Sequence, residues 1–404
     1  LICGDYHTVI YGATRSGKTR TLLLPTMCMQ MLSGADILCS DPKGELYLYT
    51  YPFAQRLGYK TYALDFKEPE KSIHYNFLQF IINALEENKI SKAIQYTWDF
   101  VDALVQEPKG NVEPLWTNGE KALMAAAVMQ VVYDNSTNGL KMQYINKNEN
   151  EIKYLYKTVH CFYQNCTNLF NYISKMSQFN PKTERLLLED IIDVLPIDHP
   201  SKMIMAIAES APSKMRGSFI TSALTSLRLF TDPNISAMTS STDADILNLD
   251  CKKVIYMIVP DGKSTYYSLV SLFTNQYYQY IADSADKQGG RLTRSCEFDL
   301  DEFGNFSKMP NLDIKITVAA GRNIHFNLFI QSKEQLVEKY GQEITKIVLD
   351  NCHFWIYLKS GGETCDMISQ KLGKYTVESS SSSSSLNNNG LFATPTNSGS
   401  TSTS

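Results

Sequence analysis

A run of eight residues near the start of the chain carries the residue types that bind phosphate. It consists of Gly12, Ala13, Thr14, Arg15, Ser16, Gly17, Lys18 and Thr19, which fits the pattern GxxxxGK[ST]. In such a loop the glycines let backbone N–H groups close around phosphate oxygens at a helix N-terminus. The lysine would neutralise the β- and γ-phosphates, and the threonine hydroxyl would ligate Mg²⁺. The run predicts a site for ATP and Mg²⁺, the alternative being a glycine-rich turn with an exposed lysine.

A pair of carboxylates much further along the chain would complete that site. A phosphate-binding loop needs a second carboxylate on a neighbouring strand, where it holds Mg²⁺ through water. The best candidate follows the apolar run 298–300. Asp301 would hold the water shell of the metal, and Glu302 would accept a proton from the attacking water. An acidic pair at a strand end is common on protein surfaces, and Asp299 is the rival, although strand alternation would direct it away from the site.

Apolar runs and turn residues place both groups at the ends of strands. Residues 7–11 predict a buried strand that enters the glycine-rich loop, and residues 19–31 predict the helix that leaves it. Further strands are expected at 35–40, 60–66, 253–260, 296–300, 325–331 and 354–358. Strands that alternate with helices imply an α/β fold with a mostly parallel sheet and crossover connections.

The middle of the chain has a different pattern. From about residue 83 to residue 235 the strand-like runs become rare, and helical patterns such as 121–133 and 185–194 dominate. The sequence therefore predicts one nucleotide-binding domain formed by residues 1–82 and 236–378, interrupted by an inserted all-α domain at 83–235. The uncharged tail at 379–404 is rich in Ser, Asn and Thr, so we expect it to be disordered.

Composition limits the classes of function. The 404 residues carry a net charge of −4, so contact with DNA would have to come from a local patch. Nine scattered cysteines without a CxxC pair, and only six histidines, argue against a zinc framework and favour buried free thiols. The longest apolar run, 122–133, is too short to cross a bilayer. Because the chain begins directly before a strand-like run, we expect that an N-terminal membrane anchor has been removed.

Five motifs occur in the order found in the type IV secretion system coupling proteins, the ATPases of conjugative DNA transfer, and the chain resembles this family. The motifs are Asp301-Glu302-Phe303-Gly304-Asn305 followed by Pro310; Ser40-Asp41-Pro42-Lys43-Gly44-Glu45-Leu46; Arg322-Asn323-Ile324 with Gln331-Ser332 and Gln335-Leu336; Glu363-Thr364, Ile368-Ser369, Leu372-Gly373 and Thr376; and Arg216 to Ile220 continuing through Phe230 to Pro233. The resemblance covers most of residues 8–377 outside the helical middle. The chain departs from the family in keeping one arginine before Ile324 and in lacking the transmembrane segments.

The resemblance implies a RecA-like P-loop motor that assembles as a hexameric ring with ATP at the subunit boundaries. Gln331 would end a strand next to the one carrying Asp301 and sense the γ-phosphate, or it would merely cap that strand. Arg322 would reach a neighbour's ATP or the DNA backbone, or it is a surface arginine. Asp41 and Lys43 would lie at the same sheet edge as the phosphate loop, in a nucleotide-proximal or switching role, or in an ordinary turn.

The helical middle resembles the all-α domain of this family, which caps the ring on its cytosolic face and helps to engage substrate. Its last part contains four basic side chains against one acidic side chain, namely Lys202, Lys214, Arg216 and Arg228 against Glu209. This excess predicts a stripe that faces DNA, or else a solvated helix face.

The function that the resemblance implies is an ATP-hydrolysing coupling protein at the cytoplasmic face of a bacterial membrane. It would recruit relaxase-bound single-stranded DNA and drive it into a type IV secretion channel during conjugation, and the sequence leaves open whether protein effectors are transferred as well. One alternative is a related hexameric DNA translocase for segregation, which would typically lack the Asp41–Leu46 and Gln331–Leu336 motifs. Another is a nucleotide-gated recruitment adaptor with little turnover, against which the intact Lys18 and Glu302 argue. A small-molecule kinase fits least, because about 280 residues separate the two nucleotide motifs.

Overall fold

The computed structural model describes residues 4–105, 114–183, 185–260, 264–359, 361–373, 380–387 and 396–403. The chain divides into two compact units, Leu1–Ser360 and Gly361–Ser404. The first unit contains all the elements that carry the predicted chemistry.

A parallel sheet of seven strands forms the centre of the first unit, in the order β3-β6-β2-β7-β8-β1-β9. The strands are β1 (His7–Gly12), β2 (Asp36–Asp41), β3 (Lys60–Asp65), β6 (Lys253–Ile258), β7 (Cys296–Leu300), β8 (Ile324–Ile330) and β9 (Cys352–Lys359). All seven strands expected from the sequence are present, and the predicted α/β fold class with a mostly parallel sheet is confirmed. Because β6 pairs with both β2 and β3, strands from before and after the helical middle belong to one sheet.

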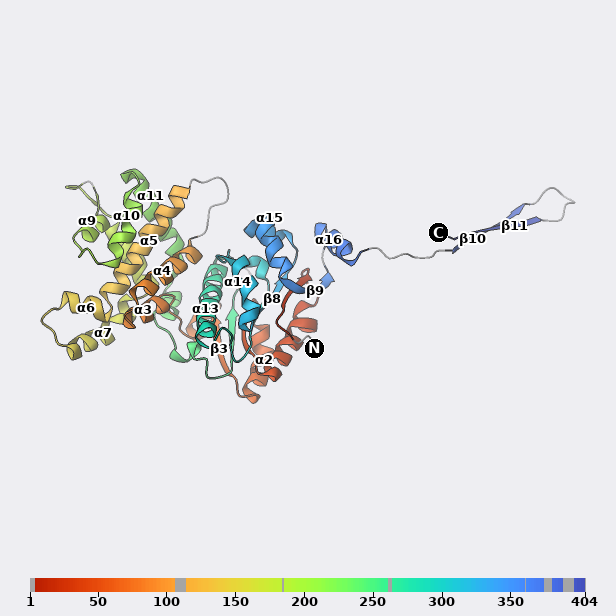
Figure 1. Cartoon of the computed structure of the whole chain (residues 1–404), viewed down its shortest axis with the longest axis horizontal. Coiled ribbons are helices and arrows are strands. Elements are labelled where there is room, and N and C mark those ends of the chain that lie inside the picture. Colours follow the sequence, from red (N-terminus) through yellow and green to blue (C-terminus); the bar gives the residue numbers. More distant parts are fainter. Residues whose placement is uncertain are drawn as a thin grey trace. The chain divides into compact units, whose positions relative to one another are not determined.

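Helices pack on both faces of this sheet, which is why its strands are apolar almost throughout. Helices α1 (Leu24–Ser33) and α2 (Glu45–Arg56) cover one face, where Met27 and Leu46 join a buried cluster with Tyr256 and Phe329. Helices α13 (Tyr267–Lys287) and α14 (Leu312–Ala319) lie along the other face (Figure 1). There the buried ring of Phe298 meets Tyr277 and Tyr278 of α13.

The segment between β3 and β6 is almost entirely helical (Figure 1). Its helices are α3 (Gln79–Glu86), α4 (Ile90–Leu104), α5 (Pro114–Asp134), α6 (Thr137–Gln143), α7 (Glu149–Tyr163), α8 (Cys166–Met176), α9 (Leu187–Asp193), α10 (Pro200–Glu209), α11 (Ser213–Leu227) and α12 (Pro233–Met238). Helix α5 is the core of this region, because its residues from Ala122 to Met129 are 0% exposed. A helix that is apolar on every side is expected to be buried in this way.

The structure differs from the sequence prediction at two places in this region. Helix α3 begins at Gln79, four residues before the predicted boundary. The predicted helix 185–194 begins only at Leu187, since Arg185 and Leu186 form the short strand β5, which pairs with β4 (Phe179–Asn180). The Arg185 guanidinium forms ion pairs with three carboxylates, those of Glu189, Asp193 and Glu209.

The second unit contains helix α16 (Glu363–Leu372) and two strands in the Ser-rich tail. The sequence predicts a disordered tail. In the structure, however, β10 (Ser380–Asn387) pairs antiparallel with β11 (Thr396–Thr403). The composition argument considers only the side chains available for a core, whereas this ladder is formed by backbone hydrogen bonds. Across the described parts of the chain, no helix is long and apolar enough to cross a membrane.

His7 joins the first strand to its neighbours through a neutral imidazole. Nε2 lies 2.8 Å from the carbonyl oxygen of Ile316, and Nδ1 accepts from the backbone N–H of Phe326 at 2.9 Å. Because one ring nitrogen accepts, a second proton would place two donors against each other. Burial is the main reason that the pKa of His7 falls to about 4.

We expect His7 to make folding stability depend on pH. The unfolded chain binds the His7 proton below about pH 6.5, but the folded chain binds it only near pH 4. The contribution of His7 is therefore complete above pH 6.5 and falls by up to about 1.4 kcal/mol per pH unit as the pH drops toward 4. Urea unfolding at several pH values should show a shallower pH dependence for His7→Asn than for wild type. His353→Asn, at an exposed histidine, is the control, and an equal loss of slope in both variants would contradict the assignment.

Candidate functional site

The phosphate-binding pattern forms a tight loop between β1 and a helix. Strand β1 ends at Gly12, the chain turns through left-handed conformations at Arg15 (φ 64°) and Gly17 (φ 85°), and a π-helical turn starts at Lys18 and continues into α1. Successive N–H groups in such alternating conformations form a concave anion site. The predicted sequence of strand, glycine-rich loop and helix is present.

Two features of the loop fit a phosphate. A Cβ atom at position 12 would lie 2.5 Å from Cγ of Lys18, so only glycine leaves room for the buried lysine side chain. The hydroxyl of Ser16 is buried and, within the described residues, has no hydrogen-bond partner. A buried hydroxyl without a partner is costly, and an anion in the loop would supply one. These residues therefore fit a bound nucleotide phosphate.

Three side chains from distant parts of the sequence meet beside this loop. The Lys18 ammonium donates to Oε1 of Glu302 at 3.1 Å, and the Gln331 side-chain amide donates to Oε2 of the same carboxylate at 2.9 Å. The side chains of Lys18 and Glu302 are 7% and 22% exposed, so the ion pair is shielded from solvent. The parallel sheet causes this meeting, because β1, β7 and β8 are neighbours and their carboxyl ends share one edge.

The two acidic residues after β7 have different surroundings. Glu302 has a left-handed backbone (φ 52°, ψ 37°), which is uncommon outside glycine and is often found at functional sites. Asp301 is 7% exposed, and its backbone carbonyl accepts from the Ser40 hydroxyl at 2.8 Å. Burial is the largest cause that raises the pKa of Asp301 to about 6, and the charge of Glu302 adds to it. A divalent cation beside Asp301 would favour its ionised form, and the Lys18 charge that acts on Asp301 belongs to the residue before Thr19, so Asp301 and Thr19 fit a Mg²⁺ site.

The rival carboxylate, Asp299, faces another part of the protein. It is fully buried, and Oδ1 accepts from the side-chain amides of Gln30 at 3.1 Å and Asn327 at 2.8 Å. Burial raises the pKa of Asp299 to about 7. The group joins α1 to β8 and, within the described residues, forms no hydrogen bond with Lys18 or Glu302, as strand alternation suggested.

Asp41 lies at the carboxyl end of β2, on the edge that carries the nucleotide motifs, and is 1% exposed. Its carboxylate accepts from the backbone N–H of Tyr47 at 2.8 Å and so closes the turn that leads into α2. The left-handed Gly44 (φ 77°) belongs to the same turn, and Lys43 is exposed. The contacts of Asp41 are those of a strand-to-helix turn. The turn lies at the sheet edge of the nucleotide motifs, so a movement of that edge would reach α2 through it.

Arg322 is the one predicted site residue that the fold places elsewhere. It precedes β8, whereas Gln331 follows β8, so the two lie at opposite edges of the sheet. Its guanidinium donates to Asp286 at 3.1 Å. Within one chain Arg322 is therefore separated from Lys18 and Glu302 by the length of a strand.

The predicted basic stripe in the helical region does not act as a unit. Arg216 pairs with the buried Glu189 at 3.0 Å, and the Lys202 ammonium donates to two backbone carbonyls near the end of α9. Arg228 is exposed, and the side chain of Lys214 lies outside the described residues. Of the three described side chains, only Arg228 extends into solvent.

Gln335 belongs to one of the sequence motifs, but the sequence alone indicates no role for it. Its side-chain oxygen accepts from the backbone N–H of Gln331 at 2.9 Å, and it packs against Gly304, where a Cβ atom would lie 2.2 Å from that oxygen. Gln335 thereby supports both Gln331 and the loop after Glu302. The spacing of four residues between two glutamines at a helix start was the available signal.

Comparisons with known proteins agree with this arrangement. Residues 1–403 match the family described as "Type IV secretory system Conjugative DNA transfer". The conjugal transfer protein TraG of Escherichia coli is 23% identical over 392 residues, which cover 93% of this chain and 56% of TraG. Protein VirD4 of Rhizobium radiobacter is 23% identical over 381 residues, which cover 93% of this chain and 49% of VirD4. The chain thus spans about half the length of these relatives.

Solved structures show the same fold. The plasmid coupling protein TrwB in complex with the non-hydrolysable ATP analogue ADPNP superposes with a TM-score of 0.61 at 14% identity, covering 91% of this chain and 75% of TrwB. TrwB in complex with ADP and Mg²⁺ gives a TM-score of 0.61 at 15% identity, with the same coverage. Together with the match over residues 1–403, these findings show that the chain belongs to the conjugative DNA-transfer family of type IV secretion systems, the family of the coupling proteins.

Proposed function

We propose that this chain is the ATP-hydrolysing motor portion of a conjugative coupling protein, which drives relaxase-bound single-stranded DNA into a type IV secretion channel. The observation that carries the enzymatic part is the Glu302 carboxylate held between Lys18 and Gln331. Membership of the DNA-transfer family supports the transport part. The TrwB complexes with an ATP analogue and with ADP and Mg²⁺ support nucleotide as the ligand.

The geometry suggests how the site would work. The loop N–H groups and the Lys18 ammonium would receive the phosphates of ATP, so Lys18 would exchange the Glu302 carboxylate for phosphate oxygens. That exchange releases Oε1 of Glu302, while Gln331 still holds Oε2. Mg²⁺, held by Thr19 and through water by Asp301, would neutralise charge on the β- and γ-phosphates.

The freed carboxylate supplies the base for hydrolysis. A water beside Glu302 would give its proton to Oε1 while its oxygen attacks the γ-phosphorus, and the bond to the β-phosphate oxygen breaks to leave ADP. Gln331 would act as a positioning residue, because its amide orients Glu302 and its backbone N–H is held by Gln335. Asp41 and Lys43 would transmit the nucleotide state to α2.

We further propose a homo-hexamer that associates with the inner membrane face through an N-terminal segment and contacts the relaxase and the channel. In a ring of this kind, Arg322 would act only on the nucleotide of a neighbouring copy or on DNA, since it lies at the opposite sheet edge from its own Lys18.

Lys18→Ala should lower ATP turnover by about 100-fold, because the charge that develops on the transferred phosphoryl group loses its cation. The measurement is phosphate release with and without single-stranded DNA. Lys153→Ala, at an exposed lysine of α7, is the matched control and should retain turnover. Unchanged turnover in Lys18→Ala would reject the assignment of this loop. Absent turnover in wild type, with tight relaxase binding, would favour the recruitment adaptor.

Gly12→Ala should weaken ATP binding at least about tenfold, because the added methyl group displaces the Lys18 side chain. Binding of a fluorescent ATP analogue would measure the effect. Gly321→Ala provides the control, since a Cβ atom there meets nothing within 4 Å. Equal affinity of the two variants would show that phosphate does not use this loop.

Gln331→Ala should lower kcat for ATP about tenfold and leave KM within about twofold, because Glu302 loses the donor that orients it but the phosphate contacts remain. Steady-state kinetics separate the two parameters. Gln79→Ala, at a glutamine whose side-chain amide donates to Asn83 of the same helix, is the comparison. A rise in KM with unchanged kcat would instead place Gln331 in ground-state binding.

A further inference from the structure

A groove of about 900 Å³ lies on the side of the molecule where the sheet edge carries the nucleotide motifs. One wall is formed by α5, α11 and the turn η3 (Arg228–Thr231), and the other by the loop 305–308 and by α15 (Glu334–Asp350). Hydroxyl side chains are prominent along it, among them Thr117, Thr221, Ser222, Thr225 and Ser268. The lining therefore combines hydroxyl groups with apolar and aromatic side chains such as Leu229 and Phe306.

The charges that face the groove favour an anion. Arg228, Lys308 and Lys339 line it, opposed by Glu120 and Glu338. Glu120 accepts a hydrogen bond from Ser226 at 3.1 Å, and burial raises the pKa of its carboxyl group. Arg228 is exposed at the groove. Basic side chains among hydroxyl groups are the chemistry that binds a phosphodiester backbone.

An aromatic ring completes the groove. Trp116 lines it with 37% of its surface exposed, and Phe219 packs against it edge to face, with ring centroids 6.0 Å apart. A tryptophan that is supported on one side and open on the other is a stacking platform for an unpaired base.

The groove is connected to the proposed catalytic carboxylate by direct contacts. Its loop 305–308 begins three residues after Glu302, and the Lys339 ammonium donates to the carbonyls of Gly304 and Phe306. Gln335, on the same helix as Lys339, holds Gln331, which holds Glu302. A ligand bound in the groove would therefore contact the loop that directly follows Glu302 and could shift this segment.

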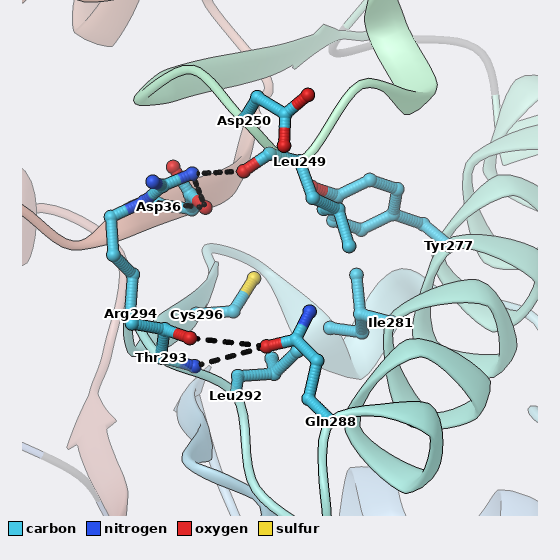
Figure 2. Close-up of a pocket in the computed structure, with 10 residues that line it drawn as sticks. All are labelled: Asp36, Leu249, Asp250, Tyr277, Ile281, Gln288, Leu292, Thr293, Arg294 and Cys296. Carbon is cyan, nitrogen blue, oxygen red and sulfur yellow. Dashed lines mark hydrogen bonds and ion pairs between the residues drawn. The ribbon is translucent and has the colours of Figure 1, made fainter.

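A second cavity in the same unit shows the contrast. It has about 360 Å³ and lies at the opposite edge of the sheet, beside Asp36 and Cys296 (Figure 2). The guanidinium of Arg294 there is bound by the Asp36 carboxylate and the carbonyls of Leu249 and Cys251, so its donors are used within the fold. The Asp36 carboxylate balances the charge of this guanidinium.

We propose that the groove binds the transported single strand of DNA, with a base stacked on Trp116 and phosphates contacted by Arg228 and Lys308. This inference rests on the proposed function, because it names where the motor holds its substrate. It also explains how the presence of DNA would reach Glu302, through the loop and helix that form one wall.

The test measures binding of a fluorescein-labelled 20-nucleotide oligo(dT) by anisotropy at several salt concentrations. The double variant Arg228→Gln with Lys308→Gln should bind at least about tenfold more weakly, and its plot of log affinity against log salt should be shallower by about 1.4, the value for two lost phosphate contacts. The control is Lys153→Gln with Lys157→Gln, which removes two exposed charges of α7, outside the groove.

Trp116 gives an independent measurement. Trp116→Ala should lower oligo(dT) affinity about tenfold, whereas Trp116→Phe should retain affinity within about threefold, because phenylalanine still presents a ring. Tryptophan fluorescence should be quenched by oligo(dT) in wild type and much less in Trp116→Phe. Equal loss in both Trp116 variants would indicate damaged packing rather than stacking and would overturn this contact.

The outcomes separate this inference from the proposed function. Groove variants that bind oligo(dT) like wild type would overturn the groove, and Lys18→Ala turnover would still decide the ATPase proposal. Binding of a relaxase fragment in the groove without any binding of oligo(dT) would also overturn it. Normal oligo(dT) binding that depends on Arg228 and Trp116, in a chain without ATP turnover, would support the groove and reject the motor.

Discussion

The clamp on Glu302 is the interaction on which the rest of the site depends. The Glu302 carboxylate is 22% exposed and accepts from both a lysine and a glutamine, and these charge-assisted bonds compete with water for its oxygen atoms. A phosphate is the natural competitor for Lys18, because it offers the ammonium a stronger anion and adds the loop N–H donors. In the proposed mechanism, activation of the base and arrival of the substrate are thus parts of one exchange.

The fold makes this exchange possible by ending four parallel strands at one edge. β1 carries the loop, β7 the carboxylates, β8 the glutamine and β2 Asp41, and β2, β7, β8 and β1 are consecutive in the sheet. Such an edge concentrates buried acidic groups, and each needs a donor or a cation. The Asp41 carboxylate accepts from the backbone of α2, and Oδ1 of Asp299 accepts from two amides while its Oδ2 has no partner within the described residues. Asp301 has the raised pKa that a metal ion would offset.

The sequence predicted the parts of the site that local pattern encodes. Strand positions, the loop from Gly12 to Thr19, and the place of Gln331 beside the strand of Asp301 follow from apolar runs and motifs. What it could not predict depends on tertiary contacts, such as the Lys18–Glu302 pair, the use of Arg216 by Glu189, and the support that Gln335 gives to Gln331. The tail shows the opposite error, since its composition concealed a ladder formed by backbone groups.

The mildly acidic balance of the chain also has a structural interpretation. Many basic groups described in the helical region form ion pairs or hydrogen bonds within the protein. Arg185 and Arg216, for example, both pair with Glu189. Three basic side chains line the groove together with two carboxylates and several hydroxyl groups. A uniformly basic surface would bind DNA at many places. A motor of the proposed kind would benefit from a local site instead, because DNA would then bind beside Glu302, where its presence can affect hydrolysis.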